Sequence, residues 1–275
     1  MNGHVVFVGA GPGDPELITR RGWRALQEAD VVLYDSLIDE RLLQGLDAEL
    51  VFVGKRCGHH SMAQEQISEL LVRHALGGKQ VVRLKGGDPT VLGRTGEEAL
   101  RLVAAGIRFE IVPGVSSAVA APAFAGIPVT HRGLADSVCI LSAHRRADEQ
   151  EFSLPPCAPR TTLVLLMAAQ TAPSWLEQLL ARGYPADLPV AFVSAATTAG
   201  QRVLVTTIGE AAKGDMMAEC GSPTMAVIGH VVSLRKSLAW FGEDAPDAAV
   251  AASTHGQSDR AGLERALSSV AHDHR

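Results

Sequence analysis

The sequence predicts an α/β protein in which short, buried strands alternate with helices. Short apolar runs recur along the chain, and most are followed within a few residues by an amphipathic helical stretch. The first run, at 5–8, is apolar at every position, as expected of a strand covered on both faces. Strand followed by helix, with short connections, indicates a mostly parallel sheet with helices on both of its faces.

The first half of the chain follows this alternation closely. Asp14 and Pro15 are typical of an N-cap followed by proline at the first helical position. We expect strands at 5–8, 31–34, 50–53, 80–84 and 109–112. We expect helices at 15–29, around 39–46, at 63–76, from about 94, and from 116 to about 126.

The second half repeats the alternation after an expected linker at 126–133. Strands are predicted at 138–142, 161–167, 190–193, 203–206 and 225–231, and helices at 174–182, 210–219 and 234–241. The strands at 190–193 and 203–206 leave little room for a helix between them, which indicates some antiparallel pairing. We therefore expect domains at 1–130 and 131–242, followed by a tail at 243–275 that is expected to be disordered.

Composition limits the classes of function. Of 275 residues, 47 % are hydrophobic and 20 % charged, which is ordinary for a globular protein, and the net charge of −5 argues against a nucleic-acid-binding surface. No apolar run spans a bilayer and no signal-peptide pattern is present, so we expect a cytoplasmic protein without a membrane partner. The cysteines lack CxxC spacing and the pair His59 and His60 lacks further ligands, so we expect reduced thiols and no metal.

The glycine-rich turn after the first strand is the first candidate for a ligand site. Gly9, Gly11 and Gly13 allow backbone shapes and close ligand approach that side chains would block. On these residues alone, a bare strand-to-helix turn and a nucleotide-type cofactor site are about equally supported. In an open α/β sheet, ligands gather at the carboxyl ends of the strands, where Asp35 and a second glycine pair, Gly86 and Gly87, also lie.

The turn differs from the known phosphate-binding patterns. A dinucleotide fingerprint requires a third glycine inside the helix, whereas this helix starts with Asp14 and Pro15. An acidic residue there would repel a pyrophosphate, and no Gly-Lys-Ser/Thr follows the glycines. A nucleoside-like cofactor without phosphate fits better, which points to S-adenosylmethionine.

The ordered motifs resemble those of the uroporphyrinogen-III C-methyltransferases, members of the tetrapyrrole methylase superfamily. The resemblance covers about residues 5–232. Its two main motifs are Val8-Gly9-Ala10-Gly11-Pro12-Gly13-Asp14-Pro15-Glu16-Leu17-Ile18-Thr19 and Gly86-Gly87-Asp88-Pro89-x-x-x-Gly93-Arg94-x-x-Glu97-Glu98. Supporting motifs are Tyr34-Asp35, Val53-Gly54-Lys55-Arg56, Pro113-Gly114-Val115-Ser116-Ser117 and Gly126-Ile127-Pro128-Val129-Thr130-His131-Arg132. The usual aromatic-rich Asp-Pro-Phe-x-Phe-Gly-Arg is Asp88-Pro89-Thr90-Val91-Leu92-Gly93-Arg94 here.

The resemblance implies a fold of two αβα domains with a cleft between them, distinct from the Rossmann methyltransferases, and a homodimer. It implies catalytic roles for Asp35 as proton acceptor and Lys55 as proton donor, and also for Arg94 and Glu97. It places the tetrapyrrole against Arg94, Glu97 and Arg132. It places S-adenosylmethionine against Pro12, Gly86, Gly87, Asp88, Val91, Ser116, Ser117, Met167 and Ala196.

The implied reaction is the methylation of uroporphyrinogen III at C-2 and C-7, giving precorrin-2 for sirohaem, cobalamin or haem d1. The many carboxylates of uroporphyrinogen III require cationic side chains in the binding site. The residues placed to supply them are Lys55, Arg56, His59, His60, Lys85, Arg94 and Arg132. The chain is expected to be monofunctional, because its first motif starts at Val5. Three alternatives stay open: a later precorrin methyltransferase, a superfamily member that methylates protein or rRNA, and a non-catalytic S-adenosylmethionine-binding module.

Several residues also have simpler interpretations. Asp35 alone would be a turn or cap residue, and Lys55 a solvated loop lysine. Glu98 is expected to complement the dipole at a helix N-terminus, and Met167 by default would fill the core at a strand end.

Overall fold

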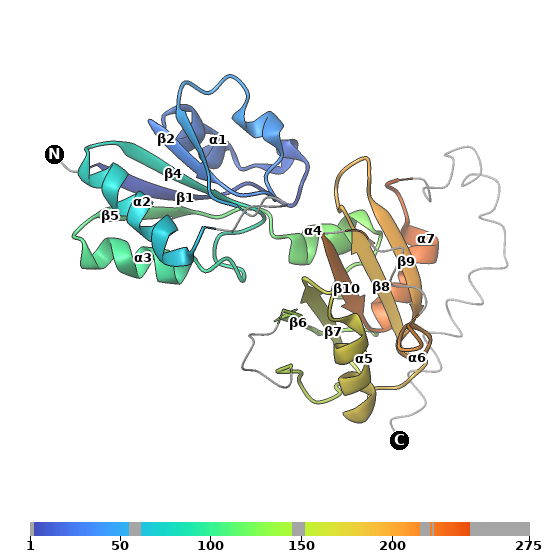
Figure 1. Cartoon of the computed structure of the whole chain (residues 1–275). Helices are drawn as coiled ribbons and strands as arrows, with labels where there is room; N and C mark the ends of the chain where they lie inside the picture. Colours follow the sequence, from blue (N-terminus) through green and yellow to red (C-terminus); the bar gives the residue numbers. More distant parts are fainter. Residues whose placement is uncertain (1–2, 55–61, 145–151, 215–220, 222, 243–275) are drawn as a thin grey trace. The chain divides into compact units, whose positions relative to one another are not determined.

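The computed structural model describes residues 3–54, 62–144, 152–214, 221 and 223–242. It divides into two compact units, Met1–Ala120 and Ala121–Arg275, each with its own sheet (Figure 1). The expected tail after 242 lies outside the described residues, as do the predicted site residue Lys55 and its neighbours through His60.

The first unit is built on a parallel five-stranded sheet in the order β3-β2-β4-β1-β5. Its strands are β1 (His4–Gly9), β2 (Val31–Tyr34), β3 (Glu49–Phe52), β4 (Gln80–Lys85) and β5 (Arg108–Val112). Its helical elements are η1 (Pro15–Leu17), α1 (Arg20–Gln27), η2 (Glu40–Leu43), α2 (Gln64–Leu76), α3 (Thr95–Ala104) and the start of α4 (Ser117–Phe124). β1 and β4 are adjacent inner strands, and each leads directly into a glycine-rich loop.

Alternation along β1 determines which helices cover each face of this sheet. Val5 and Phe7 pack with α2 and α3, which lie side by side (Figure 1), whereas Val6 and Val8 pack with α1 and η2. Because successive side chains of a strand point to opposite faces, an inner strand must be apolar at every position to be covered on both. This is the pattern from which the sequence predicted the strand.

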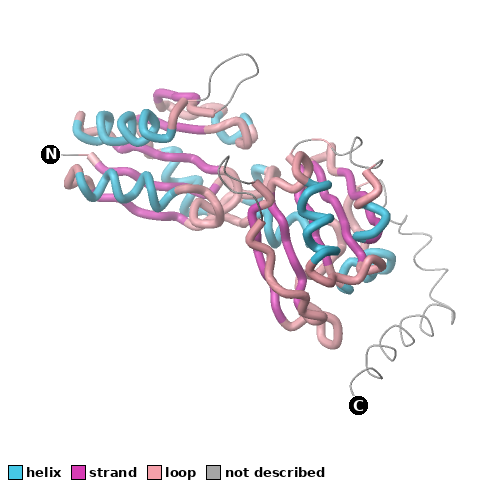
Figure 2. Tube along the Cα trace, turned by 60° about the horizontal axis from the view of Figure 1, so that its bottom comes forward, coloured by secondary structure: helices cyan, strands magenta, loops and turns pink. Residues whose placement is uncertain are grey.

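The second unit contains a mixed five-stranded sheet in the order β6-β7-β10-β8-β9. Figure 2 shows strands in magenta and helices in cyan. Its strands are β6 (Ser137–Ser142), β7 (Thr161–Leu166), β8 (Pro189–Ser194), β9 (Arg202–Thr207) and β10 (Thr224–Ile228). Its other helical elements are α5 (Ala172–Ala181), α6 (Ile208–Ala211), η4 (His230–Leu234) and α7 (Arg235–Leu238). β10 is antiparallel to both β7 and β8, and β9 is antiparallel to β8, which confirms the expected antiparallel pairing.

The core of the second unit is centred on Trp175 of α5. Trp175 is fully buried and stacks at a tilt on Phe192 of β8, with ring centroids 5.9 Å apart. Its indole N–H donates to the carbonyl of Ala168 at 2.9 Å, so the one polar atom of the ring is satisfied inside the core. This packing fixes α5 against the sheet next to the segments that follow β7.

Several helices are shorter than the sequence predicted. The helix expected at 15–29 is two elements, because Asp14 caps η1 and Thr19 caps α1 by accepting from the N–H of Gly22 at 3.1 Å. The helices expected around 39–46 and at 234–241 are the 3-10 turn η2 and the pair η4 and α7. Within the described residues, no helix is both long and apolar enough to cross a lipid bilayer.

Candidate active site

Two glycine-rich loops are joined to each other at the carboxyl edge of the first sheet. After β1 and β4, Gly11 donates its N–H to the carbonyl of Gly87 at 3.2 Å, and Gly87 donates to the carbonyl of Gly11 at 2.7 Å. Ala10 also donates to the carbonyl of Lys85 at 2.8 Å. Beyond the parallel strands, the two loops are therefore joined by an antiparallel bridge between Gly11 and Gly87 and hold each other in place.

The loop after β5 closes onto the same point. A methyl group on Gly114 would lie 2.3 Å from the carbonyl oxygen of Gly87 and 2.7 Å from Cα of Gly9, which is closer than atoms can approach. Gly11 and Gly87 also have positive φ angles, +87° and +65°, which are strongly unfavourable for residues that carry a Cβ atom. Glycine is required here by close backbone contact, and the result is an edge lined by main chain.

Asp88 ties two of these loops together through its side chain. One carboxylate oxygen accepts from the N–H of Gly114 at 3.0 Å. The other accepts from the N–H and the hydroxyl of Thr90 at 2.8 and 2.6 Å. Asp88 thus holds the loops after β4 and β5 at a fixed separation, a structural role that the sequence did not reveal.

The predicted cofactor residues of the first unit come together at this edge. Pro12 follows Gly11 directly and is partly buried, as are Gly86, Asp88 and Val91. Ser116 and Ser117 lie at the start of α4, and the space beside Gly87 is bounded by the backbone of Ser117. Asp14 caps η1 by accepting from the N–H of Glu16 at 3.0 Å, so an acidic group stands at the helix start, where a pyrophosphate would be repelled.

Asp35 lies just beyond β2 at the same edge, and its carboxylate is held on both oxygens. One oxygen accepts from the N–H of Leu37 at 3.1 Å, and the other lies 3.7 Å from the guanidinium of Arg83. The side chain of Asp35 is 25 % exposed, whereas that of Arg83 is 5 % exposed. A partly exposed carboxylate at a strand end, backed by a buried cation, is suited to exchange a proton with a ligand.

The expectation that Lys85 serves substrate carboxylates is wrong, whereas Glu98 stands in the first turn of α3, where it was expected to complement the helix dipole. Glu98 is fully buried in the first turn of α3, where it accepts from Lys85 at 3.0 Å and from Gln64 at 2.7 Å. Lys85 is 5 % exposed, so its ammonium faces Glu98 rather than a substrate. Burial lowers the pKa of Lys85, the neighbouring Arg83 lowers it further, and Glu98 opposes this shift. Helix and strand packing has converted two apparent surface charges into a buried pair.

Arg94 and Glu97 form a bidentate ion pair at the start of α3. The guanidinium donates to the carboxylate at 2.9 and 2.7 Å, and both side chains are more than half exposed. The hydrogen bond with Glu97 raises the pKa of Arg94. Because an exposed pair contributes at most about 1 kcal/mol, Arg94 can exchange this partner for another carboxylate at little cost.

Met167 and Ala196, the two predicted cofactor residues of the second unit, follow β7 and β8 in segments of strained backbone. Met167 has a φ of +58°, and Ala196 lies between Ala195 and Thr197, with φ values of +46° and +66°. Met167 is 50 % exposed, so the default interpretation as core filler is wrong. Strain of this kind persists only where the surroundings enforce it, and it is concentrated at binding sites.

Arg132, the predicted substrate residue of the second unit, is exposed and follows His131, which pairs with Ala135.

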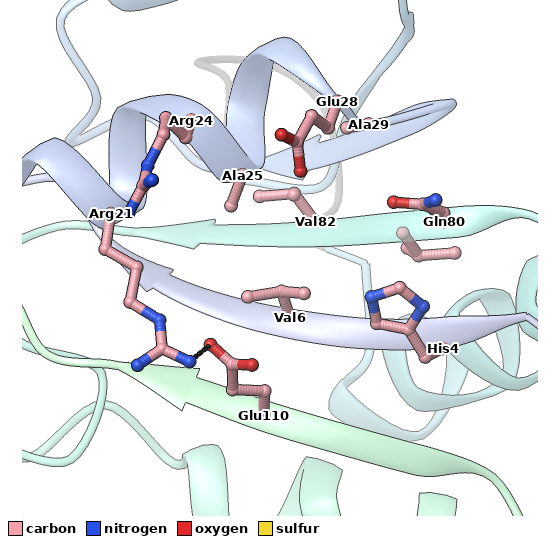
Figure 3. A pocket seen from close by; sticks show the side chains of 11 residues that line it. His4, Val6, Arg21, Arg24, Ala25, Glu28, Ala29, Gln80, Val82 and Glu110 are labelled. Carbon is pink, nitrogen blue, oxygen red and sulfur yellow. Dashed lines mark ion pairs between the residues drawn. The ribbon is translucent and has the colours of Figure 1, made fainter.

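A hollow of about 230 Å³ lies between α1 and the face of the first sheet, extending from the starts of β1 and β4 to the middle of β5 (Figure 3). His4 and Gln80 stand at the starts of β1 and β4, and Arg21 of α1 pairs with Glu110 of β5 at 2.7 Å (Figure 3). None of the predicted site residues lines it. Among the described residues, no cluster of three or more His, Cys, Asp or Glu side chains is placed to hold a metal ion.

Arg83, Gln64 and the pairing of Glu98 with Lys85 were not predicted from the sequence. A signal was present: Arg83 and Lys85 occupy alternate positions of a strand whose other residues after Gln80 are apolar, so both side chains point to one covered face. Buried charges require partners, and α3 supplies one in Glu98.

The parallel first sheet, its glycine-lined carboxyl edge and the acidic helix start define a nucleotide-type cofactor protein distinct from dinucleotide-binding folds. The chain belongs to the family of tetrapyrrole (corrin/porphyrin) methylases, whose model matches residues 4–212. It is therefore a methyltransferase by family.

Curated and structural relatives agree with this assignment. Siroheme synthase 1 of Yersinia enterocolitica is 46 % identical over 245 residues, which are 88 % of this chain and 51 % of that protein. The chain thus spans about half the length of the curated relatives that it matches. The native uroporphyrin III C-methyl transferase of Thermus thermophilus is 41 % identical with a TM-score of 0.73, covering 84 % of this chain and 100 % of that one. The same Thermus protein complexed with S-adenyl homocysteine matches at 40 % identity with a TM-score of 0.71, covering 84 % and 93 %. These matches confirm the resemblance and the fold class inferred from the sequence.

Proposed function

We propose that the chain is an S-adenosylmethionine-dependent C-methyltransferase that converts uroporphyrinogen III to precorrin-2 by methylation at C-2 and C-7. The observation that carries this proposal is the main-chain edge formed by Gly9, Gly11, Gly87 and Gly114 in a member of the methylase family. Such an edge fits a neutral, flat nucleoside group that needs close backbone approach and no phosphate site. The Thermus relative supports the choice of cofactor and substrate.

The cofactor would be held by both backbone and small side chains. The proposed cofactor contacts are Pro12, Gly86, Gly87, Asp88, Val91, Ser116, Ser117, Met167 and Ala196. Loops fixed by mutual hydrogen bonds fit this role, since a preorganised site loses little entropy on binding. When bound, S-adenosylmethionine supplies an electrophilic methyl group.

The chain's own contribution to chemistry would be alignment and proton handling. An electron-rich pyrrole carbon is already a nucleophile, so holding it in line with the methyl group can contribute on the order of 7–11 kcal/mol. Asp35 would accept the proton that the methylated, cationic pyrrole ring loses to become neutral again, and Lys55 is proposed as the proton donor that the resemblance implies. Arg94, Glu97 and Arg132 would face the substrate, with Arg94 exchanging Glu97 for a substrate carboxylate.

Assembly, location and pathway belong to the same proposal. We propose a cytoplasmic homodimer whose product serves sirohaem, cobalamin or haem d1 synthesis, with no nucleic acid or membrane as partner. The net charge of −5 supports the exclusion of nucleic acid, and the siroheme synthase relatives support a sirohaem route.

The proposal is tested by separating cofactor binding from turnover. Asp35→Ala, Arg94→Ala and Arg132→Ala are each compared with the unaltered chain for S-adenosylhomocysteine affinity by calorimetry and for dimethylated product. We expect affinities close to that of the unaltered chain and a loss of product of about 100-fold or more for Asp35→Ala. Full turnover in all three variants would contradict the proposed catalytic and substrate roles.

A further inference from the structure

A cluster of buried charges lies directly behind Asp35, between β4 and α3. Arg83, Lys85 and Glu98 are 4 %, 5 % and 0 % exposed. Glu98 accepts from the ammonium of Lys85 at 3.0 Å, and its other oxygen lies 3.5 Å from Nε of Arg83. The guanidinium of Arg83 therefore spans the distance between Glu98 inside the unit and Asp35 at its edge.

The register of the sheet explains why Arg83 reaches Asp35. Arg83 of β4 lies opposite Leu33 of β2, two residues before Asp35. Its Nη1 donates to the carbonyl of Leu84 at 2.9 Å and approaches that of Leu33 at 3.4 Å, while Nη2 faces Asp35. These backbone contacts fix the plane of the guanidinium and hence the direction of the N–H groups that face Asp35.

The charges of the cluster balance only when Asp35 is included. Two buried cations, Arg83 and Lys85, face a single buried carboxylate, that of Glu98. An unpaired charge in a low-dielectric interior is strongly unfavourable, so the second cation requires a second carboxylate. Asp35 supplies it from the edge, and this attraction holds its second oxygen while the N–H of Leu37 holds the first.

We propose that Arg83, itself held by Glu98, is a positioning residue that fixes the carboxylate of Asp35 at the carboxyl end of β2. This rests on the proposed function, in which Asp35 is the proton acceptor. Arg83 is buried behind Asp35, so its proposed effect on the substrate is indirect and acts through Asp35. A carboxylate restrained on both oxygens meets the reacting proton without a conformational search, and a misplacement of about 1 Å can lower turnover about 100-fold.

A double-mutant cycle tests whether Arg83 acts through Asp35. Arg83→Met leaves Lys85 and Glu98 as a balanced pair, so the variant is expected to fold. We expect it to lower kcat by roughly 10- to 100-fold while KM for S-adenosylmethionine stays within about twofold. In the Asp35→Asn background, Arg83→Met is expected to change kcat by less than about twofold, because the group that it positions is already gone. If the fold losses in kcat of the two single variants multiply in the double variant, the proposal is overturned.

A second readout does not depend on activity. If Arg83 restrains Asp35, Arg83→Met frees the carboxylate, and the Leu37 amide, which donates to it, exchanges its hydrogen faster. Arg235→Met is the matched control, since Arg235 is also buried and donates to the carbonyl of Ala125 at 2.6 Å, but in the second unit. It is expected to lower the melting temperature without changing Leu37 exchange.

The two readouts separate the proposals. If the unaltered chain makes no dimethylated product, yet Arg83→Met accelerates Leu37 exchange, the proposed function fails and the positioning of Asp35 stands. If Leu37 exchange is the same in Arg83→Met as in the unaltered chain, the positioning role is overturned whatever the activity.

Discussion

Replacing Gly114 with alanine perturbs the contact on which the candidate cofactor edge depends. The added methyl group would lie 2.3 Å from the carbonyl oxygen of Gly87 and 2.7 Å from Cα of Gly9, both backbone atoms. Ordinary contact begins at about 3.4 Å, so the loop after β5 must move by roughly 1 Å from its neighbours. That movement acts directly on the hydrogen-bonded pair formed by Gly11 and Gly87.

The magnitude follows from two contributions. Overpacking against rigid surroundings costs about 1–3 kcal/mol. Losing the two hydrogen bonds between Gly11 and Gly87 adds about 0.5–1.5 kcal/mol each, for a total of roughly 2–6 kcal/mol. A loss of stability at the lower end of this range, about 2 kcal/mol, corresponds to a fall in melting temperature of about 4 °C. We expect affinity for S-adenosylhomocysteine to fall by at least about tenfold, since the edge no longer has its preorganised shape.

Thermal unfolding and isothermal calorimetry measure both effects. Gly96→Ala is the matched control, because a methyl group there meets nothing within 4 Å and lies in helix α3 of the same unit. Its melting temperature is expected to stay level or rise slightly. A Gly114→Ala chain that melts and binds like the unaltered chain would refute the close packing of the three loops.

Two further predictions concern single side chains. Asp88→Ala removes the acceptor of the Gly114 and Thr90 N–H groups. We expect the free energy of unfolding, measured by denaturant titration, to fall by about 1–3 kcal/mol and cofactor binding to weaken. An unchanged midpoint of the denaturant titration would contradict the proposal that Asp88 holds the two loops together. Burial raises the pKa of Tyr184 to about 12 from 10.0, and its hydroxyl donates to the carbonyls of Pro155 and Pro156. Because the folded pKa is the higher one, this stabilisation is fully present below pH 10 and is lost as the pH rises towards 12. The difference in melting temperature between the unaltered chain and Tyr184→Phe should therefore become smaller above pH 10. A difference that stays constant with pH would contradict a raised pKa for Tyr184.

Strand positions could be predicted well because buried parallel strands are apolar at every position. β1, β2 and β4 each lie within a few residues of the predicted ranges. Helix boundaries were harder, since Thr19 competes with Asp14 as a capping residue and interrupts the expected helix. The place of β10 between β7 and β8 could not be read from the sequence, because partners of a strand are chosen by tertiary packing.

The glycine loops could be predicted to meet, because the carboxyl ends of parallel strands share one edge. Their direct bonding through Gly11 and Gly87, and the tether through Asp88, depend on distances that only the folded chain defines. The pairing of Lys85 with Glu98 was missed for a similar reason. Each residue reads as a surface charge in its own segment, and only the packing of α3 on β4 buries both.

The proposed reaction is the methylation of uroporphyrinogen III at two carbons. The most direct measurement is the mass of the tetrapyrrole after incubation with S-adenosylmethionine, taken together with the amount of S-adenosylhomocysteine formed. We expect a product carrying two added methyl groups and two molecules of S-adenosylhomocysteine for each product molecule. Tetrapyrrole of unchanged mass, from a chain that is folded and binds S-adenosylhomocysteine, would contradict it.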